Sequence, residues 1–146
     1  MKGYHEKPEE TANTFLDGWF RTGDLVRYDD DGMLYVEDRI KELIKVKGFQ
    51  VPPAELEEVI RDFPGLAEAA VIGVPHEYNG EAPRAYVVTK EDVTVDVGEL
   101  KMYVESKVSH FKRLLGGVAI VETIPKNASG KILRKQLKLD YENKGI

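Results

Sequence analysis

The sequence has no cysteine among its 146 residues, which excludes disulfide bonds, thiol catalysis and zinc sites built on cysteine. Its three histidines, His5, His76 and His110, are scattered and lack the paired spacing of a metal site. No apolar run approaches the roughly 20 residues that a membrane-spanning helix needs. Residues 1–10 do not form a secretory signal, because no apolar stretch follows their first charge. A globular chain without a transmembrane segment is therefore expected.

The charge balance is acidic. The chain has 26 Asp and Glu against 21 Lys and Arg, and this net charge of −5 argues against general nucleic-acid binding. Two basic segments interrupt the balance. Residues 39–47 (RIKELIKVK) hold four cations and one acid, and residues 126–138 (KNASGKILRKQLK) hold five cations and no acid. Such segments are either solvated faces of helices and loops or two places that bind the same polyanion, and charge alone leaves both readings open.

The N-terminal part of the chain predicts one hairpin and little else. Residues 1–18 are polar and lack periodicity, which predicts irregular structure. Leu25–Tyr28 and Met33–Val36 flank an Asp-Asp-Asp-Gly segment, and an Asp-Gly pair between short runs predicts a β-hairpin. The Leu43-Ile44 pair fits a strand as well as a helix, because its apolar run is too short for periodicity to decide.

From residue 53 onward, the pattern predicts an α+β domain with a small mixed or antiparallel sheet flanked by helices. The first helix has Pro53 at its first position and an apolar stripe at i, i+3, i+4 and i+7. Asp96 is a helix cap, with Glu99 three residues on as its capping-box partner. The predicted elements are helices at 53–63, from 96 to about 108 and from 133 onward, and strands at 69–74, 84–89 and 118–122, with a long loop at 75–80.

Two glycine-containing segments are candidates for ligand contact. Residues 18–25 (GWFRTGDL) have a glycine before Asp24. In a tight loop, the glycine lets the backbone approach a ligand, and the carboxylate can accept both hydrogen bonds that a ribose diol donates. Residues 45–50 (KVKGFQ) combine cations, a glycine and an amide, and Gly48 would permit close passage of a thin ligand. Taken singly, each segment also fits an ordinary turn.

A third segment, PKNASGK at residues 125–131, lies between a predicted strand and a predicted helix, as a phosphate-binding P-loop does. The P-loop pattern requires Gly at the first position and Ser or Thr after the lysine. This sequence has Pro125 and Ile132 there, so the segment is not a P-loop. It is either an ordinary surface loop or a flexible glycine loop that carries Lys131 to a phosphate or carboxylate as a point charge.

The order and spacing of these motifs resemble the C-terminal end of adenylate-forming enzymes over nearly the whole chain. GWFRTGDL is followed by EDRIKELIKVKGFQVPPAELE, GVPHEYNGEAP, FKRLLGGV and IPKNASGKILR. The superfamily includes acyl-CoA synthetases, aryl-CoA ligases similar to 4-coumarate–CoA ligase, beetle luciferase and peptide-synthetase adenylation domains. The pairs Asp38-Arg39 and Lys47-Gly48 resemble the aryl-CoA ligase and luciferase branch, because peptide-synthetase domains usually carry Gly-Arg and Arg-Gly here.

The resemblance implies a reaction in two steps. ATP activates a small carboxylic acid to an acyl-adenylate with release of pyrophosphate, and a thiol, usually that of coenzyme A, then displaces AMP. The C-terminal domain rotates between the steps. By position, Lys131 matches the lysine that drives adenylate formation, and Lys41 matches the hinge. Asp24 matches the aspartate that binds the ribose hydroxyls, and Arg39 matches an arginine near that ribose.

The other matched residues lie in segment 45–50. Lys45 and Gln50 match residues of the thioester-forming face and of the adenylate contacts, so the resemblance implies a catalytic role for Lys45 and nucleotide binding for Gln50. Gly48 matches the glycine that lines the pantetheine passage, and its neighbours Lys47 and Phe49 are expected to contact CoA with it. A glycine at that point removes a side chain that would obstruct a flexible thiol arm.

The resemblance also implies that part of the enzyme is missing. The family's ATP phosphate loop, acyl pocket, and adenine and metal motifs belong to a large N-terminal domain. Residues 1–38 are expected to be the last hairpin of that domain, and residues 39–146 the mobile C-terminal domain. ATP, Mg²⁺ and coenzyme A are then bound mainly with the N-terminal domain, and an isolated fragment is expected to be inactive.

The function expected from the resemblance is the C-terminal portion of an ATP-dependent acid–CoA ligase. Two alternatives remain: a luciferase-like or carrier-protein-loading adenylation enzyme, and a stand-alone module that binds nucleotide or CoA. The last residues, ENKGI, carry no Ser-Lys-Leu peroxisomal signal. A cytoplasmic or peroxisomal location is expected.

Overall fold

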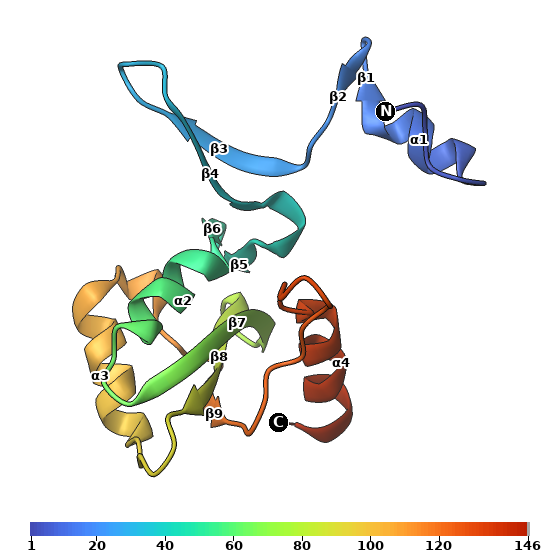
Figure 1. Cartoon of the computed structure of the whole chain (residues 1–146). Helices are drawn as coiled ribbons and strands as arrows, with labels where there is room; N and C mark the ends of the chain where they lie inside the picture. Colours follow the sequence, from blue (N-terminus) through green and yellow to red (C-terminus); the bar gives the residue numbers. More distant parts are fainter. Residues whose placement is uncertain (146) are drawn as a thin grey trace.

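The computed structural model describes residues 1–145, and its N-terminal part lies apart from the main sheet (Figure 1). The expectation of irregular structure at residues 1–18 is wrong, because a short helix begins at Pro8, where a missing N–H leaves no helical bond unmade. This helix buries no residue, so no apolar period marks it in the sequence. The N-terminal elements are α1 (Pro8–Thr14), β1 (Phe15–Leu16), β2 (Trp19–Phe20), β3 (Asp24–Tyr28) and β4 (Leu34–Arg39).

The predicted Asp-Gly hairpin is confirmed, since β3 and β4 pair antiparallel. Its turn is held by Asp29, whose Oδ1 accepts hydrogen bonds from the backbone N–H groups of Asp31 (3.1 Å) and Met33 (2.9 Å). Gly32 has a φ of 78° there, a conformation that suits glycine. The β1–β2 and β3–β4 pairs are separate two-stranded sheets outside the main sheet.

The main sheet has five strands and is mixed, as expected. Strand order is β6-β5-β8-β7, and β9 pairs parallel with β8 while the other neighbours are antiparallel. The ambiguous Leu43-Ile44 segment leads into a strand in which buried Ile44 and Val46 alternate with exposed Lys45. The strands are β5 (Ile44–Val46), β6 (Phe49–Val51), β7 (Leu66–His76), β8 (Gly80–Thr89) and β9 (Val118–Ile120).

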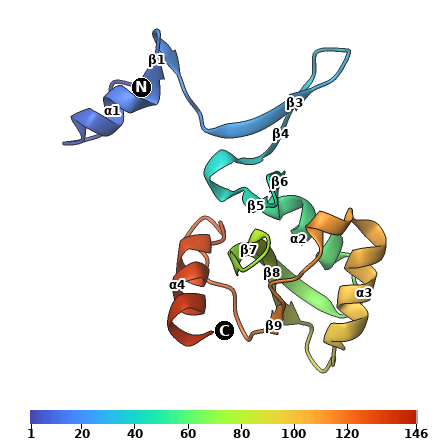
Figure 2. The same cartoon turned by 180° about the vertical axis from the view of Figure 1, so that it is seen from behind.

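Helices cover both faces of this sheet, and Figure 2 shows the same layers from behind. Helices α2 (Pro53–Arg61) and α3 (Val97–Lys107) lie on one face, and α4 (Arg134–Lys144) lies on the other. Strand β7 alternates between the two cores, because Val71 packs with the α2 and α3 side and Ile72 packs with Leu137 of α4. A strand buried on both faces reads as a continuous apolar run.

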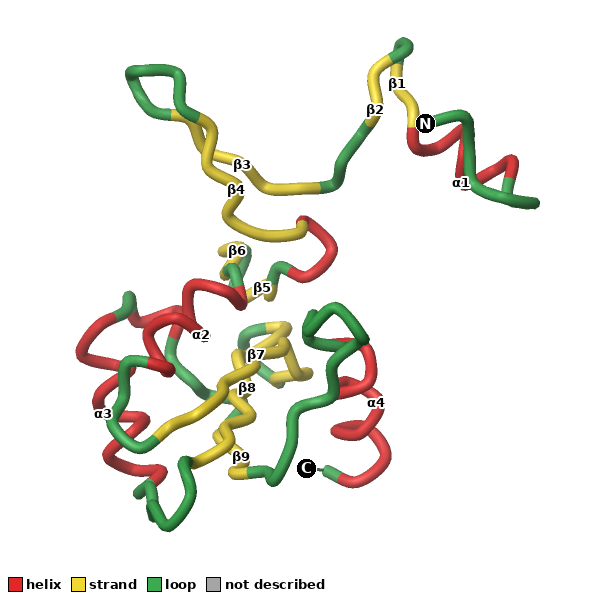
Figure 3. Tube along the Cα trace, in the orientation of Figure 1, coloured by secondary structure: helices red, strands yellow, loops and turns green. Residues whose placement is uncertain are grey.

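Two sequence predictions about connections have different outcomes. The cap of α3 is confirmed, since Asp96 Oδ1 accepts the backbone N–H of Glu99 at 2.8 Å. The long loop expected at residues 75–80 is wrong, because β7 extends to His76 and β8 begins at Gly80. The length of this connection is set by how far β7 and β8 pair, and not by the turn-forming residues within it. The connection from β9 into α4 is longer than the one between β7 and β8, as Figure 3 shows.

Two short 3-10 helices complete the fold: η1 (Ile40–Glu42), between β4 and β5, and η2 (His110–Lys112), after α3. Within residues 1–145, no helix combines the length and the apolar character needed to cross a membrane.

Candidate functional site

A pocket of about 740 Å³ lies where the N-terminal hairpins meet the main domain. Four of the residues singled out from the sequence line it together: Asp24, Arg39, Lys41 and Lys131. Lys41 lies in η1. Asp24 and Arg39 lie at one end of the β3–β4 pair, and Lys131 lies in the loop before α4. The two basic segments of the sequence therefore meet at one pocket.

Strand register brings Asp24 and Arg39 together, because they are direct partners across β3 and β4. The Arg39 Nε lies 2.8 Å from Asp24 Oδ1, and Arg39 Nη1 donates to the Thr22 carbonyl at 2.9 Å. The Asp24 side chain is 24% exposed, so its carboxylate is accessible from the pocket. A carboxylate with a neighbouring guanidinium can accept hydroxyl hydrogen bonds and face a phosphate at the same time.

The loop that carries Lys131 is organised by one side chain. Asn127 Oδ1 accepts the backbone N–H groups of Ser129 (3.0 Å) and Lys131 (2.8 Å) and the Ser129 hydroxyl (2.8 Å). Lys126 and Ile132 form an isolated bridge at its base. The sequence left open whether this segment is an ordinary surface loop or a flexible glycine loop. The hydrogen bonds of Asn127 hold the backbone from which the Lys131 side chain extends.

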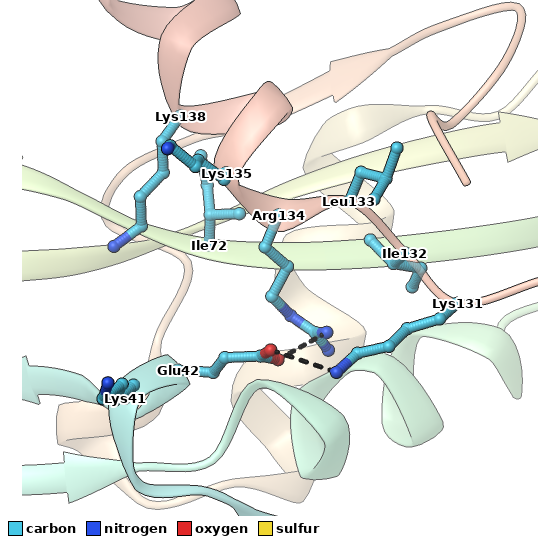
Figure 4. Close-up of a pocket in the computed structure, with 9 residues that line it drawn as sticks. All are labelled: Lys41, Glu42, Ile72, Lys131, Ile132, Leu133, Arg134, Lys135 and Lys138. Carbon is cyan, nitrogen blue, oxygen red and sulfur yellow. Dashed lines mark hydrogen bonds and ion pairs between the residues drawn. The ribbon is translucent and has the colours of Figure 1, made fainter. Parts of the chain in front are cut away.

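The Lys131 ammonium belongs to a network of alternating charges that the sequence analysis missed. Its Nζ lies 3.5 Å from Glu42 Oε1, and Glu42 Oε2 accepts a hydrogen bond from Arg134 at 2.9 Å (Figure 4). Arg134 also donates to both oxygens of Glu57, at 2.8 and 2.9 Å. The sequence contains one sign of this network. Glu57 lies next to Leu56 of the apolar stripe in the first predicted helix, so its carboxylate is placed near the buried face and needs a partner there.

Burial decides the electrostatics of Glu57, a side chain only 9% exposed. Desolvation raises the pKa of this carboxyl above its usual range, and the charge of Arg134 and the N–H of Val71 oppose that rise. The Val71 N–H donates to Glu57 Oε1 at 2.8 Å, so α2, β7 and α4 meet at one carboxylate.

A second pocket, of about 410 Å³, adjoins the first and shares Lys41, Glu42 and Lys131 with it. Its lining also includes Lys135 and Lys138 of α4 (Figure 4). The Glu42–Lys131 pair thus borders both pockets.

The remaining candidates lie elsewhere, on the β5–β6 hairpin. Lys45 and Gln50 are direct cross-strand partners, and neither lines the pocket that contains Asp24. Phe49 stacks on Phe111 of η2, with ring centroids 4.3 Å apart and planes 11° apart. The structure therefore separates Gln50 from Asp24 and Arg39, with which the sequence analysis had grouped it as nucleotide-binding.

Gly48 is in the turn of that hairpin. Its φ is 85° and that of Lys47 is 48°, as in the two-residue turns with two positive φ angles that match strand twist. A Cβ at Gly48 would have no atom within 4 Å. The turn itself therefore favours glycine, and the described chain forms no wall around it.

Within residues 1–145, no group of three or more His, Asp or Glu side chains is arranged to hold a metal ion.

Similar proteins in plants are CoA ligases. The chain is 49% identical over 138 residues to 4-coumarate–CoA ligase-like 4 of Oryza sativa subsp. japonica, covering 94% of this chain and 25% of that protein. It is 48% identical over 139 residues to 4-coumarate–CoA ligase 1 of Solanum tuberosum, with the same coverage. The chain thus spans about a quarter of the length of the curated relatives it matches.

Solved structures resemble the chain over nearly its full length. MatB from Rhodopseudomonas palustris, bound to ATP, superposes with a TM-score of 0.89 at 36% identity, covering 97% of this chain and 28% of that one. The apo form of MatB superposes with a TM-score of 0.71 over the same shares of the two chains, at 37% identity. The α+β fold is thereby shared with solved enzymes.

The family model described as the AMP-binding enzyme C-terminal domain matches residues 55–131, about half of the chain. This range runs from the start of α2 to Lys131. The chain therefore belongs to the family of AMP-binding enzyme C-terminal domains.

Proposed function

We propose that this chain is the C-terminal part of an ATP-dependent acid–CoA ligase, which forms an acyl-adenylate and then an acyl-CoA thioester. The observation that carries the proposal is the pocket that joins Asp24 and Arg39 to Lys131 across η1. The names of the plant relatives, 4-coumarate–CoA ligases, support CoA as the thiol. The acid substrate is selected by the larger N-terminal part.

In the first step, different residues of the pocket contact the ribose and the phosphate of the nucleotide. The Asp24 carboxylate accepts hydrogen bonds from the ribose hydroxyls, and Arg39 orients that carboxylate through their 2.8 Å ion pair. Adenylation joins two anions, so negative charge builds on the α-phosphate and carboxylate oxygens. The Lys131 ammonium compensates this charge where it develops. Mg²⁺, which would be held mainly by the N-terminal part, would supply further compensation of the phosphate charge.

The second step is assigned to the β5–β6 hairpin, which carries Lys45 as a catalytic cation and Gln50 as an adenylate contact. Lys47, Gly48 and Phe49 are proposed to contact CoA. Two observations support a second face. These residues share one exposed hairpin, and they are not in the pocket of Lys131. The two faces must then visit the adenylate in turn.

Residues 1–38 are proposed to be the end of the N-terminal domain, and residues 39–146 the mobile domain. Support comes from the exposed apolar side chains of the hairpins, such as Trp19 (80% exposed) and Tyr28 (78%). An isolated two-stranded hairpin is marginally stable in water, so these faces need a partner surface. The chain superposes on ATP-bound MatB with a TM-score of 0.89 and on apo MatB with a TM-score of 0.71. This difference supports more than one arrangement of the N-terminal part relative to the mobile domain.

Lys41, in η1, is proposed as the hinge. Asp38 Oδ2 accepts the N–H of Ala54 at 3.1 Å, so a bond across η1 must break when the domain swivels. Proline locks φ at about −65°, so Lys41→Pro is expected to trap one arrangement. The two half-reactions, measured separately in the longer protein, should then separate, with one retained and the other lost. Normal kinetics for both would remove Lys41 from this role.

Gly48→Leu is expected to leave acid-dependent pyrophosphate exchange nearly intact and to lower CoA-dependent product sharply, if pantetheine passes over this backbone. The positive φ adds a stability cost of about 1–2 kcal/mol for any L side chain. Gly48→Ala pays that cost without the bulk, so it is the matched control. Melting temperature is recorded beside both half-reactions. If alanine and leucine behave alike and activity follows stability, Gly48 is only a turn glycine.

The function is tested by comparing the isolated chain with the longer protein. With ATP, Mg²⁺ and a panel of fatty and aryl acids, the chain alone should release no pyrophosphate, and the longer protein should release it and consume CoA. Robust turnover by the chain alone would contradict the fragment proposal. Adenylation without CoA consumption would favour a luciferase-like or carrier-loading enzyme.

A further inference from the structure

The Arg134 guanidinium is fixed from three directions. One Nη donates to both oxygens of Glu57, the other donates to Glu42 at 2.9 Å, and Nε donates to the carbonyl of Val71 at 3.3 Å. Arg134 is the first residue of α4, and its side chain is 13% exposed. A planar guanidinium whose three nitrogens all donate hydrogen bonds has little freedom to turn. Arg134 is therefore a rigid support for Glu42, which accepts a hydrogen bond from its Nη1.

Glu42 is what contacts it, and the two oxygens of Glu42 have different partners. Oε2 is held by Arg134, and Oε1 faces the Lys131 ammonium at 3.5 Å. Figure 4 shows the Glu42 carboxylate facing both cations, with a dashed line to each. The side chains of Lys131, Glu42 and Arg134 are 54%, 25% and 13% exposed, so the Glu42–Lys131 pair is more open to solvent than the Glu42–Arg134 pair.

An exposed pair of this kind contributes little to stability. Its effect is on position. A free lysine side chain samples many rotamers, and the contact with Glu42 restricts Lys131 to the rim of the pocket that Asp24 also lines. Because the pair is long and hydrated, Lys131 can exchange Glu42 for an anionic ligand at small cost.

We propose that Glu42 is a positioning residue for Lys131, held in place by Arg134 and Glu57. The inference rests on the proposed function, since it assigns Lys131 to adenylate formation. Glu42 acts only through Lys131 and does not contact substrate. It restricts the positions that the Lys131 ammonium occupies before charge develops in the transition state. The restriction affects the rate of adenylate formation and not the stability of the fold.

In the longer protein, Glu42→Gln is expected to lower the kcat of acyl-adenylate formation by about tenfold, less than removal of the lysine itself because the charge remains. KM for ATP should stay within about twofold, because the loss is in the transition state. Thioester formation from supplied acyl-adenylate and the melting temperature should be unchanged. Glu68→Gln is the matched control, because Glu68 pairs with Lys126 of the same loop at 2.7 Å.

A double-mutant cycle sharpens the test. In a Lys131→Ala background, Glu42→Gln should have no further effect on adenylation, because a residue that acts through another has nothing left to position. Additive losses would overturn the inference. So would a single variant that adenylates as fast as the wild type or faster, or one in which both half-reactions and the melting temperature fall together.

A measurement on the 146-residue chain needs no activity. Nuclear magnetic relaxation of the Lys131 ε-methylene should report greater mobility in Glu42→Gln and no change in Glu68→Gln. Equal mobility in all three proteins would overturn the inference whatever the kinetics. A restricted lysine in a longer protein that forms no adenylate with any acid would instead contradict the proposed function, so the two failures are distinguishable.

Discussion

Lys131→Ala in the longer protein is expected to lower the rate of acyl-adenylate formation by about 10²–10³, the usual loss when one oriented charge stabiliser is removed. The lysine supplies a positive charge where the attacking carboxylate and the α-phosphate meet. Its backbone is held by Asn127 at 2.8 Å, so truncation of the side chain leaves the loop intact. The loss is therefore expected in kcat and not in folding.

The measurement separates the half-reactions. Acid-dependent pyrophosphate exchange should fall, and thioester formation from supplied acyl-adenylate should be much less affected. Lys126→Ala is a control for loss of a cation from the same loop, since Lys126 pairs with Glu68 and does not line the Asp24 pocket. An equal fall of both half-reactions would show that Lys131 does not belong to one face.

Arg134→Met is expected to destabilise the 146-residue chain by about 3–5 kcal/mol near neutral pH, because it leaves the Glu57 carboxylate buried without its partner. Methionine keeps an unbranched side chain that fills the inner part of the space, so the loss comes chiefly from the missing charge and hydrogen bonds. Urea denaturation of both proteins measures it. A loss below about 1 kcal/mol would mean that water or another cation replaces the guanidinium.

The loss should depend on pH with a definite sign. Burial raises the pKa of Glu57, and Arg134 opposes that rise, so the variant raises it further. A carboxyl with a raised pKa keeps its proton in the folded state where the unfolded state has lost it, so its contribution to the free energy of unfolding falls as pH increases. The difference between variant and wild type should therefore shrink from about pH 7 to about pH 5. A constant difference would contradict this origin.

A double variant provides the control. Arg134→Met combined with Glu57→Gln removes both charges, and glutamine keeps an acceptor for the Val71 N–H, which Glu57 now binds at 2.8 Å. Replacing both members of a buried ion pair is often nearly neutral. The double variant should recover most of the stability and lose the pH dependence.

Local patterns in the sequence determined much of the fold. The Asp-Gly turn of the β3–β4 hairpin, the proline-initiated helix α2 and the Asp96 cap of α3 each depend on residues within a few positions of one another. Such features are decided by backbone preference and by one apolar stripe, so a short window contains their cause.

Patterns failed where packing with distant residues decides the outcome. Helix α1 has no buried residue and so no stripe to read. Ile44 begins strand β5, which pairs with the adjacent β6 and also, through Val46 and Gly80, with β8. The loop expected at 75–80 is short because β7 and β8 pair as far as His76 and Gly80. The pairing of β5 with β8 joins Val46 to Gly80, and no short window of sequence contains both residues.

The sequence by itself assigned this chain to the end of an adenylate-forming enzyme and singled out Asp24, Arg39 and Lys131, because the order of motifs is written along the chain. Only the tertiary structure brought Glu42 and Glu57 to Arg134, from 92 and 77 residues away. A buried charge is tolerated only where partners converge from several elements, and that convergence is a property of how the helices pack on the sheet.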